Sequence, residues 1–253
     1  MNRFLCYTAK SPAHDLALEE AIHSAVEDGS SPNSWRVWQA ASPAVILGTG
    51  QESAKEVDLE CAKSEQIAVL RRHSGGGTVV IGPGAINYSA TFRIEDLPGS
   101  ETIQGAMSAA LKPVIGLLCK WGLNVQAAGL SDLSLKGTDG LLRKLAGNSQ
   151  ARKKLSVVVH GTLLADPDWE RLERLLRFPS RVPDYRAGRQ HRDFLTSLKE
   201  NEAPFDLAAF GSGLLSVLSY GINSEDRPSQ NELALTEKLF GDKYARSEWN
   251  LRR

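Results

Sequence analysis

Cysteine is scarce in this chain, and the few that occur fall in no pattern that would bind a metal. Only three are present among 253 residues, Cys6, Cys61 and Cys119. An odd and sparse count argues against a disulfide framework in a chain of this length. No Cys-x-x-Cys pair and no cysteine–histidine pairing indicates a structural zinc site. The composition is typical of a reducing compartment, and we expect the protein to be cytoplasmic.

An excess of one charge and a long apolar run are also missing. The 30 lysines and arginines balance the 30 acidic residues, so no basic field favours nucleic acid or an anionic membrane. No apolar run approaches the roughly 20 residues that a membrane span needs, and residues 1–10 lack the apolar core of a signal peptide. We therefore expect that the protein binds neither nucleic acid nor a membrane. We expect residues 1–253 to form one domain, with about 180–253 as its C-terminal helical part.

The most informative segment that is present is a run of three glycines, Gly75 to Gly77, directly behind Arg71, Arg72, His73 and Ser74. Glycine lets the backbone come close to a ligand, and successive peptide N–H groups can form an anion-binding concavity. Guanidinium groups beside the loop add charge and a forked set of donors. The pattern predicts a loop that grips a phosphate or an acyl-adenylate.

Two known nucleotide-binding loops do not fit this segment, and one simpler turn stays open as an alternative. The loop is neither a P-loop nor a dinucleotide fingerprint, because the residues after it predict a strand and not a helix. A simple glycine-rich hairpin turn stays open as the alternative. In the binding hypothesis Arg72 pairs with a phosphate or an acyl carboxylate. Arg71 should face the other way along an extended strand and form a surface salt bridge.

A second pair of motifs joins the glycine loop. Lys144 begins the run K-L-A-G-N-S-Q, and His160 begins H-G-T-L-L inside an apolar stretch at 157–164. Together with R-R-x-S-G-G-G-x-V from Arg71, these motifs resemble the lipoate–protein ligase family, part of the wider biotin/lipoate ligase and octanoyltransferase group. Further matching pieces are D-L-A-L-E-E-A at Asp15–Ala21, V-I-L-G at Val45–Gly48, I-N-Y-S at Ile86–Ser89 and E-W-N at Glu248–Asn250. The resemblance spans nearly the whole chain.

The order of predicted elements favours an α+β fold with a central mixed or antiparallel sheet flanked by helices, as the resemblance also implies. Helices are predicted at 12–29, 57–66, 102–121, 168–176, 207–218 and 232–239, and strands at 35–39, 44–47, 67–70, 78–81, 86–92, 124–127, 133–135 and 157–164. Strands 78–81 and 86–92 should form a hairpin around Gly82-Pro83-Gly84. Pro113 should kink or restart the third helix.

The resemblance implies a reaction with ATP and Mg²⁺, in which lipoate is activated as lipoyl-AMP and transferred to a lysine. The acceptor would lie on a lipoyl carrier domain, E2-type or like the glycine-cleavage H protein. Lys144, which we expect just before an Ala-Gly turn, would be the catalytic lysine. Candidate substrate- and nucleotide-binding residues are Arg72, Ser74, Gly75, Gly76, Gly77, Thr78, Val79, Val80, Asn87, Asp132, Gly147, His160, Gly161 and Thr162; Asp132 is also a candidate metal ligand.

Some positions depart from the family pattern. Ser131-Asp132 stands where an Asn-Asp pair is usual, and Val159 stands where many ligases have a histidine. His160 is expected to position other groups and not to act as a base, and His73 is expected to be exposed. The C-terminal domain common in lipoate ligases is expected to be absent, and two alternatives stay open: a separate polypeptide supplies it, or the chain needs none.

Three alternatives to a ligase are open. An octanoyltransferase would need a cysteine nucleophile, whereas Cys119 is predicted to be a core residue of a helix and none of the three lies in the motifs. A biotin ligase would carry an alternating G-R-G-R loop, which is missing. A non-catalytic homologue that binds an acyl-adenylate is the third. The sequence does not select among lipoate, octanoate and other acids.

Overall fold

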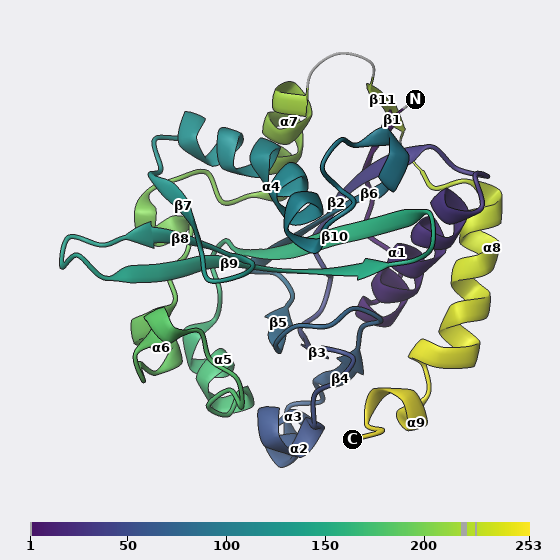
Figure 1. The fold of residues 1–253 in the computed structure, drawn as a ribbon. Helices are drawn as coiled ribbons and strands as arrows, with labels where there is room; N and C mark the ends of the chain where they lie inside the picture. The colour runs from purple at the N-terminus through teal and green to yellow at the C-terminus, as the bar shows by residue number, and fades with distance from the viewer. Residues whose placement is uncertain (1, 219–221, 226) are drawn as a thin grey trace.

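Two sheets organise the chain (Figure 1). The computed structural model describes residues 2–218, 222–225 and 227–253. The large sheet has eight strands in the order β11-β1-β2-β6-β10-β9-β8-β7, and the small sheet has three in the order β4-β3-β5. The strands are β1 Asn2–Cys6, β2 Asn33–Trp38, β3 Ala44–Leu47, β4 Ala68–Arg71, β5 Val79–Ile81, β6 Ala85–Arg93, β7 Val125–Ala128, β8 Asp132–Lys136, β9 Leu142–Arg152, β10 Ser156–Leu164 and β11 Ile222–Glu225. Because β1 pairs in parallel with β2 and β11 while the other pairs of the large sheet are antiparallel, the predicted mixed sheet is confirmed.

Helices flank the large sheet on both sides (Figure 1). They are α1 Pro12–Glu27, α2 Ser53–Glu56, α3 Leu59–Ser64, α4 Ile103–Lys120, α5 Trp169–Leu175, α6 His191–Phe194, α7 Leu207–Leu218, α8 Gln230–Leu239 and α9 Ser247–Asn250, with short 3-10 turns at Ile94–Asp96, Asp184–Arg186 and Lys199–Asn201 and a π-helical turn at Phe240–Tyr244. Within the described part of the chain, no helix combines the length and apolarity that crossing a bilayer requires. The C-terminal part contains a strand, β11, as well as the predicted helices.

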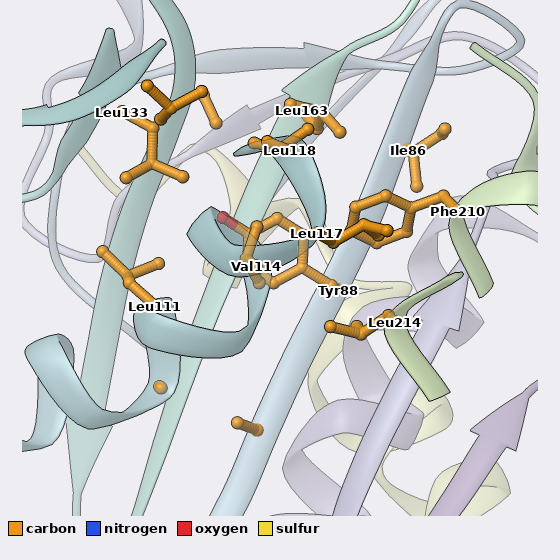
Figure 2. Packing of buried hydrophobic residues seen from close by; sticks show 14 of the residues in the cluster. Ile86, Tyr88, Leu111, Val114, Leu117, Leu118, Leu133, Leu163, Phe210 and Leu214 are labelled. Atoms are coloured by element: carbon orange, nitrogen blue, oxygen red, sulfur yellow. The ribbon is translucent and has the colours of Figure 1, made fainter. Parts of the chain in front are cut away.

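The alternating pattern of the central strands separates a dry face from a polar one. On β6, Ile86 and Tyr88 join the main core, whereas Asn87 and Ser89 point to the opposite face. The core packs the apolar side of α4 and Phe210 of α7 against the sheet, as Figure 2 shows. One face of the sheet is thereby closed by α4 and α7, and the polar face is left for α1 and for the site.

The predicted hairpin of β5 and β6 is wrong, because the two strands belong to different sheets. β5 pairs with β3, and β6 pairs with β2 and β10. The connection between them fits against other backbone: a Cβ on Gly84 would lie 2.3 Å from the carbonyl oxygen of Asp166. The chain therefore passes from one sheet to the other at the glycines instead of folding back on itself.

Of the kink or restart expected at Pro113 of α4, the restart is wrong, because the helix continues through this residue. The expectation for Cys119 is corrected as well. Cys119 lies on the exposed side of α4, since Val114, Leu117 and Leu118 occupy the side that faces the core. Cys6 is exposed as well, and Cys61 is partly exposed. Packing in the core therefore does not explain Cys119 or Cys6.

Candidate functional site

A large cavity lies between the polar face of the large sheet, β5, α1 and the segment 179–186. Its volume is about 1380 Å³, above the range of roughly 300–1,000 Å³ that holds one drug-sized ligand. Every residue predicted for the site except Ser74 lines it, namely Arg72, Gly75, Gly76, Gly77, Thr78, Val79, Val80, Asn87, Asp132, Lys144, Gly147, His160, Gly161 and Thr162. The glycine loop and the lysine segment, some 70 residues apart in sequence, thus line one cavity.

Lys144 lies within strand β9 and not before a turn, which corrects the sequence prediction. The β8–β9 register shifts between Leu133 and Ser134, so a bulge sets the direction of the lysine beside Asp132. Lys144 Nζ lies 2.8 Å from Asp132 Oδ1. Gly147 makes room for this pair, because a Cβ at that position would lie 2.7 Å from Nζ. The Lys144 side chain is 28% exposed and lines the cavity.

Tyr185 completes the lysine–carboxylate pair, and sequence reasoning missed it. Its hydroxyl donates to Asp132 Oδ2 at 2.8 Å. Burial, and then the nearby Asp132 carboxylate, raise the pKa of Tyr185, so the phenol stays protonated and remains a donor. Nothing local in the sequence marks this tyrosine, since it lies in an irregular segment more than fifty residues from its partner.

Asp132 does not have the surroundings of a resident metal ligand. Both of its carboxylate oxygens already accept a bond, one from Lys144 and one from Tyr185. Among the residues that the structure describes, no group of three His, Cys, Asp or Glu side chains is placed to hold a metal ion.

Arg72 is buried and shapes the glycine loop. Its Nε donates to Ser74 Oγ at 2.9 Å, and its Nη2 donates to the carbonyl oxygens of Gly75 and, at 2.8 Å, Gly77. Burial lowers the pKa of Arg72 to about 10, which leaves it charged at neutral pH. Contact between Arg72 and a phosphate or carboxylate stays a prediction, because the donors that point into the loop are already used.

The loop leaves its own amides available. Ser149 Oγ also donates to the Gly75 carbonyl oxygen, at 2.9 Å. Of the hydrogen bonds formed by residues 2–218, 222–225 and 227–253, none uses the backbone N–H of Gly75, Gly76 or Gly77. Carbonyls that already accept hydrogen bonds, and N–H groups without a partner in the described chain, leave this part of the cavity lining able to donate to an anion.

A buried chain of hydrogen bonds, hereafter the relay, connects the glycine loop to α1. Ser74 Oγ lies 2.6 Å from His160 Nε2, and His160 Nδ1 lies 2.7 Å from Glu19 Oε2. Since Arg72 can only donate, the Ser74 hydroxyl gives its own proton to Nε2, and His160 donates from Nδ1 to the carboxylate. Burial alone would raise the pKa of Glu19, but His160 and its hydrogen bond lower it to about 2.

The relay defines the place of His160. Both ring nitrogens are used, so this histidine has no free lone pair for a substrate, and it lies in the middle of β10 between two other strands. Glu19 lies in the D-L-A-L-E-E-A motif but was not predicted as a site residue. Its position on the buried side of α1 was the available signal.

Arg71 is fully buried, which corrects the expected surface salt bridge. It donates to the carbonyl oxygens of Gly48 at 2.9 Å and Gln51 at 2.7 Å, and also to that of Asn250. Asn250 Oδ1 in turn accepts from the Arg71 amide at 3.0 Å, and Trp249 Nε1 donates to the Arg71 carbonyl at 2.8 Å. The E-W-N motif is therefore a fastening for β4, the strand that leads into the glycine loop.

His73 is not exposed as predicted. Both of its ring nitrogens are buried, and its ring lies 5.8 Å from that of His23 on α1. Burial is the main reason that the pKa of His73 falls to about 4, so the ring is neutral at physiological pH. The side chain therefore packs toward α1, and His73 is not among the residues that line the cavity.

The cysteines lie away from the cavity. None of Cys6, Cys61 and Cys119, all within the described chain, contributes to its lining. Acyl transfer through a cysteine thioester needs the thiol at the reacting carbon. Among the described residues, the cavity lining contains Lys144 and the glycine loop but none of the three cysteines.

Comparison with known proteins gives a consistent family. Residues 11–218 match the lipoyl protein ligase A/B catalytic domain. The chain is 29% identical over 281 residues to the octanoyltransferase LipM of Brevibacillus brevis, covering 99% of both chains. It is 26% identical to subunit 1 of lipoate-protein ligase A of Thermoplasma acidophilum, covering 93% of this chain and 90% of that one.

Solved structures agree in fold. A crystal structure of lipoate-protein ligase A bound with ATP superposes with a TM-score of 0.83 at 23% identity, over 99% of this chain and 98% of that one. A bipartite lipoate protein ligase studied with its E2 lipoyl domain from Thermoplasma acidophilum gives 0.82 at 23% identity, over 99% and 96%. The mixed sheet flanked by helices is thus a fold shared with these ligases.

Proposed function

The chain belongs to the lipoyl protein ligase A/B catalytic domain family, and on that premise we propose that it is a lipoate–protein ligase. It would convert lipoate and ATP into lipoyl-AMP and pyrophosphate, and then pass the lipoyl group to a lysine of a carrier domain with release of AMP. The observation that carries this proposal is the single cavity lined both by Lys144 and by the glycine loop, whose amides have no hydrogen-bond partner within the described chain.

Each half of the reaction needs negative charge to be stabilised at a fixed point. In the first half, the acid's carboxylate attacks the α-phosphorus and pyrophosphate leaves. In the second half, a neutral amine attacks the acyl carbon, which places a negative charge on the acyl oxygen. The carbonyl double bond then forms again and AMP is expelled. The Lys144 ammonium would lie against the acyl carbonyl and the α-phosphate in both halves. The N–H groups of Gly75 to Gly77 would bind phosphate oxygens.

The remaining predicted residues have supporting roles. Arg72, Ser74 and His160 would keep the loop carbonyls turned away from the anion. Strand β5 is the edge of the small sheet, so the backbone of Thr78 to Val80 is available to adenine. Asp132 would hold Lys144, and the proton that the attacking amine must lose would pass to the departing phosphate or to solvent. Asn87, Gly147, Gly161 and Thr162 would line the acyl chain and the phosphates.

An octanoyltransferase is the second candidate, because the Brevibacillus brevis relative carries that activity. It would take the acyl group from a carrier thioester through a cysteine. The three cysteines lie outside the cavity lining, which favours the ligase. Changing each cysteine to serine separates the two: full activity in all three variants agrees with a ligase, and loss in one supports the transferase.

The acceptor would be a lysine on a lipoyl carrier domain, of the E2 type or like the glycine-cleavage H protein. The Thermoplasma relative is named as one subunit of its ligase, so a separate accessory polypeptide is also part of the proposal. ATP–pyrophosphate exchange should therefore be measured with lipoate, octanoate and biotin in parallel, with and without such a polypeptide. Exchange with none of the acids, together with acyl transfer from a carrier thioester, would exclude the ligase.

Replacing Lys144 with alanine tests the assignment directly. We expect Lys144→Ala to lower exchange and transfer at least about 100-fold, because it removes the cation at the reacting carbon. Its ion pair is part-exposed, so the unfolding midpoint should stay close to that of the wild type. Lys136→Ala, at an exposed position on the neighbouring strand β8, is the matched control and should keep full activity. Turnover retained in Lys144→Ala would remove the proposal.

A further inference from the structure

An exposed leucine lies at the mouth of the cavity. Leu130 occupies the turn between β7 and β8, where its side chain is 99% exposed while the residue lines the cavity. Turns of this kind favour Gly, Asn, Asp and Ser, and Gly129 and Ser131 on either side fit that rule. A large apolar side chain between them gains nothing from the fold of this chain.

Two more apolar side chains lie on the segment beside this turn. Val182 and Phe178 are each 44% exposed, and Val182 also lines the cavity. The turn and the segment are neighbours, because a Cβ on Gly129 would lie 3.7 Å from side-chain atoms of Pro183 and Tyr185. Leu130 and Val182 therefore line the cavity from neighbouring segments and are hereafter the rim patch, and Phe178 lies four residues before Val182 on the same segment.

The rim patch is bordered by positive charge. Residues 177–192 contain five arginines and one acidic residue in a chain whose net charge is zero. Arg192 pairs with Glu200, while Arg189 donates to main-chain carbonyl oxygens. Arg177 and Arg181 are exposed and form no ion pair with any residue that the structure describes. The surface beside the rim patch thus carries unbalanced positive charge.

We propose that the rim patch is the docking surface for the acyl-acceptor protein, and that this partner presents a lysine between acidic residues and an apolar contact for Leu130. This inference rests on the proposed function and adds the place and chemistry of the partner. The acceptor amine must come to Lys144 through this mouth, on a four-carbon side chain, so its domain has to sit on the rim. A bare ammonium would be repelled by Arg177 and Arg181, and acids next to the lysine compensate that charge.

The test uses Leu130→Asp with Ile103→Asp as its matched control. Ile103 is 68% exposed at the start of α4 and does not line the cavity. Three rates are compared: ATP–pyrophosphate exchange, formation of the hydroxamate when hydroxylamine attacks the acyl-AMP and releases AMP, and transfer to a purified E2 lipoyl domain. We expect Leu130→Asp to keep the first two and to raise KM for the lipoyl domain by about tenfold or more, since the apolar contact is replaced by like charge against an acidic partner.

Charge is tested with Arg177→Glu, which lies outside the cavity lining. It should raise KM for the lipoyl domain, and salt should raise KM more for the wild type than for this variant. An equal loss of all three rates in Leu130→Asp would place Leu130 in the acid or nucleotide site and overturn the proposal. So would unchanged transfer, or a wild-type dimer that Leu130→Asp dissociates. Absence of exchange in the wild type would instead refute the proposed function.

Discussion

Gly161 shows how a single residue can fix the surroundings of the site. It stands on β10 between Tyr88 on β6 and Asn148 on β9. Across it, Tyr88 donates to Asn148 Oδ1 at 2.5 Å, and Asn148 Nδ2 donates to the carbonyl oxygen of Ser131 at 2.7 Å. Ser131, the residue next to Asp132, is therefore held by the Asn148 side chain, and a Cβ at position 161 would overlap that side chain.

We expect Gly161→Ala to lower the free energy of unfolding by about 1–3 kcal/mol, the usual cost of overpacking. The new Cβ would lie 2.0 Å from Asn148 Oδ1 and 2.6 Å from the Tyr88 ring. Urea unfolding followed by circular dichroism measures the change. Gly241→Ala is the control, because no atom lies within 4 Å of its Cβ position. An unchanged midpoint in Gly161→Ala would show that the three strands separate more easily than the structure implies.

The catalytic assignment also depends on single residues, and here the sequence allowed only part of it to be predicted. Lys144 and the glycine loop carry recognisable motifs, so their shared cavity was expected. Glu19 and Tyr185 were missed because each acts only through a partner far away in sequence. Arg71 was misplaced because strand alternation gives the side to which a side chain points but not what covers that side.

Among the elements, the four-residue helix α9 holds the strand β4 in place. It is fastened to β4 by the hydrogen bonds of Arg71, Trp249 and Asn250. β4 in turn leads directly into the glycine loop. Two of the sequence motifs, the arginine–glycine run that begins at Arg71 and E-W-N at Glu248–Asn250, are thereby connected.

Removing the Arg71 side chain should detach this element. We expect Arg71→Met to lower the free energy of unfolding by about 3 kcal/mol or more, since hydrogen bonds from a buried charged group are lost together. Amide exchange at residues 247–250 should rise most. Arg174→Met, which removes a solvent-screened ion pair with Glu65, should change the free energy of unfolding far less than Arg71→Met does. Uniform exchange changes throughout Arg71→Met would argue against a local fastening.

The whole molecule should be sensitive to acid because several histidines are buried neutral. Burial is the main reason that the pKa of His23 falls to about 3 and the pKa values of His73 and His191 to about 4. In the unfolded chain each would titrate near 6.5. Between about pH 6.5 and pH 4 the unfolded state therefore binds more protons than the folded one, and stability falls as the pH falls.

The expected result is a free energy of unfolding that is nearly constant above about pH 7 and declines steeply toward about pH 4.5. Below that range Glu19, whose pKa is lowered to about 2, adds a further loss as the unfolded carboxylate takes up a proton. Urea unfolding at a series of pH values measures the slope. His23→Met should make the slope shallower by about one proton. A slope that is the same in this variant would contradict the assignment of His23.

What the sequence determined by itself was local and periodic: the helices α1, α4 and α7, the apolar strand β10, and the motifs that mark the family. These depend on residues a few positions apart, so the pattern alone contains them. Tertiary structure alone decided that β5 and β6 lie in different sheets, that Arg71 is covered by α9, and that Asp132 is shared by Lys144 and Tyr185. Those outcomes arise from contacts between segments far apart in the chain, whose free energy depends on which surfaces remain available once the core has formed.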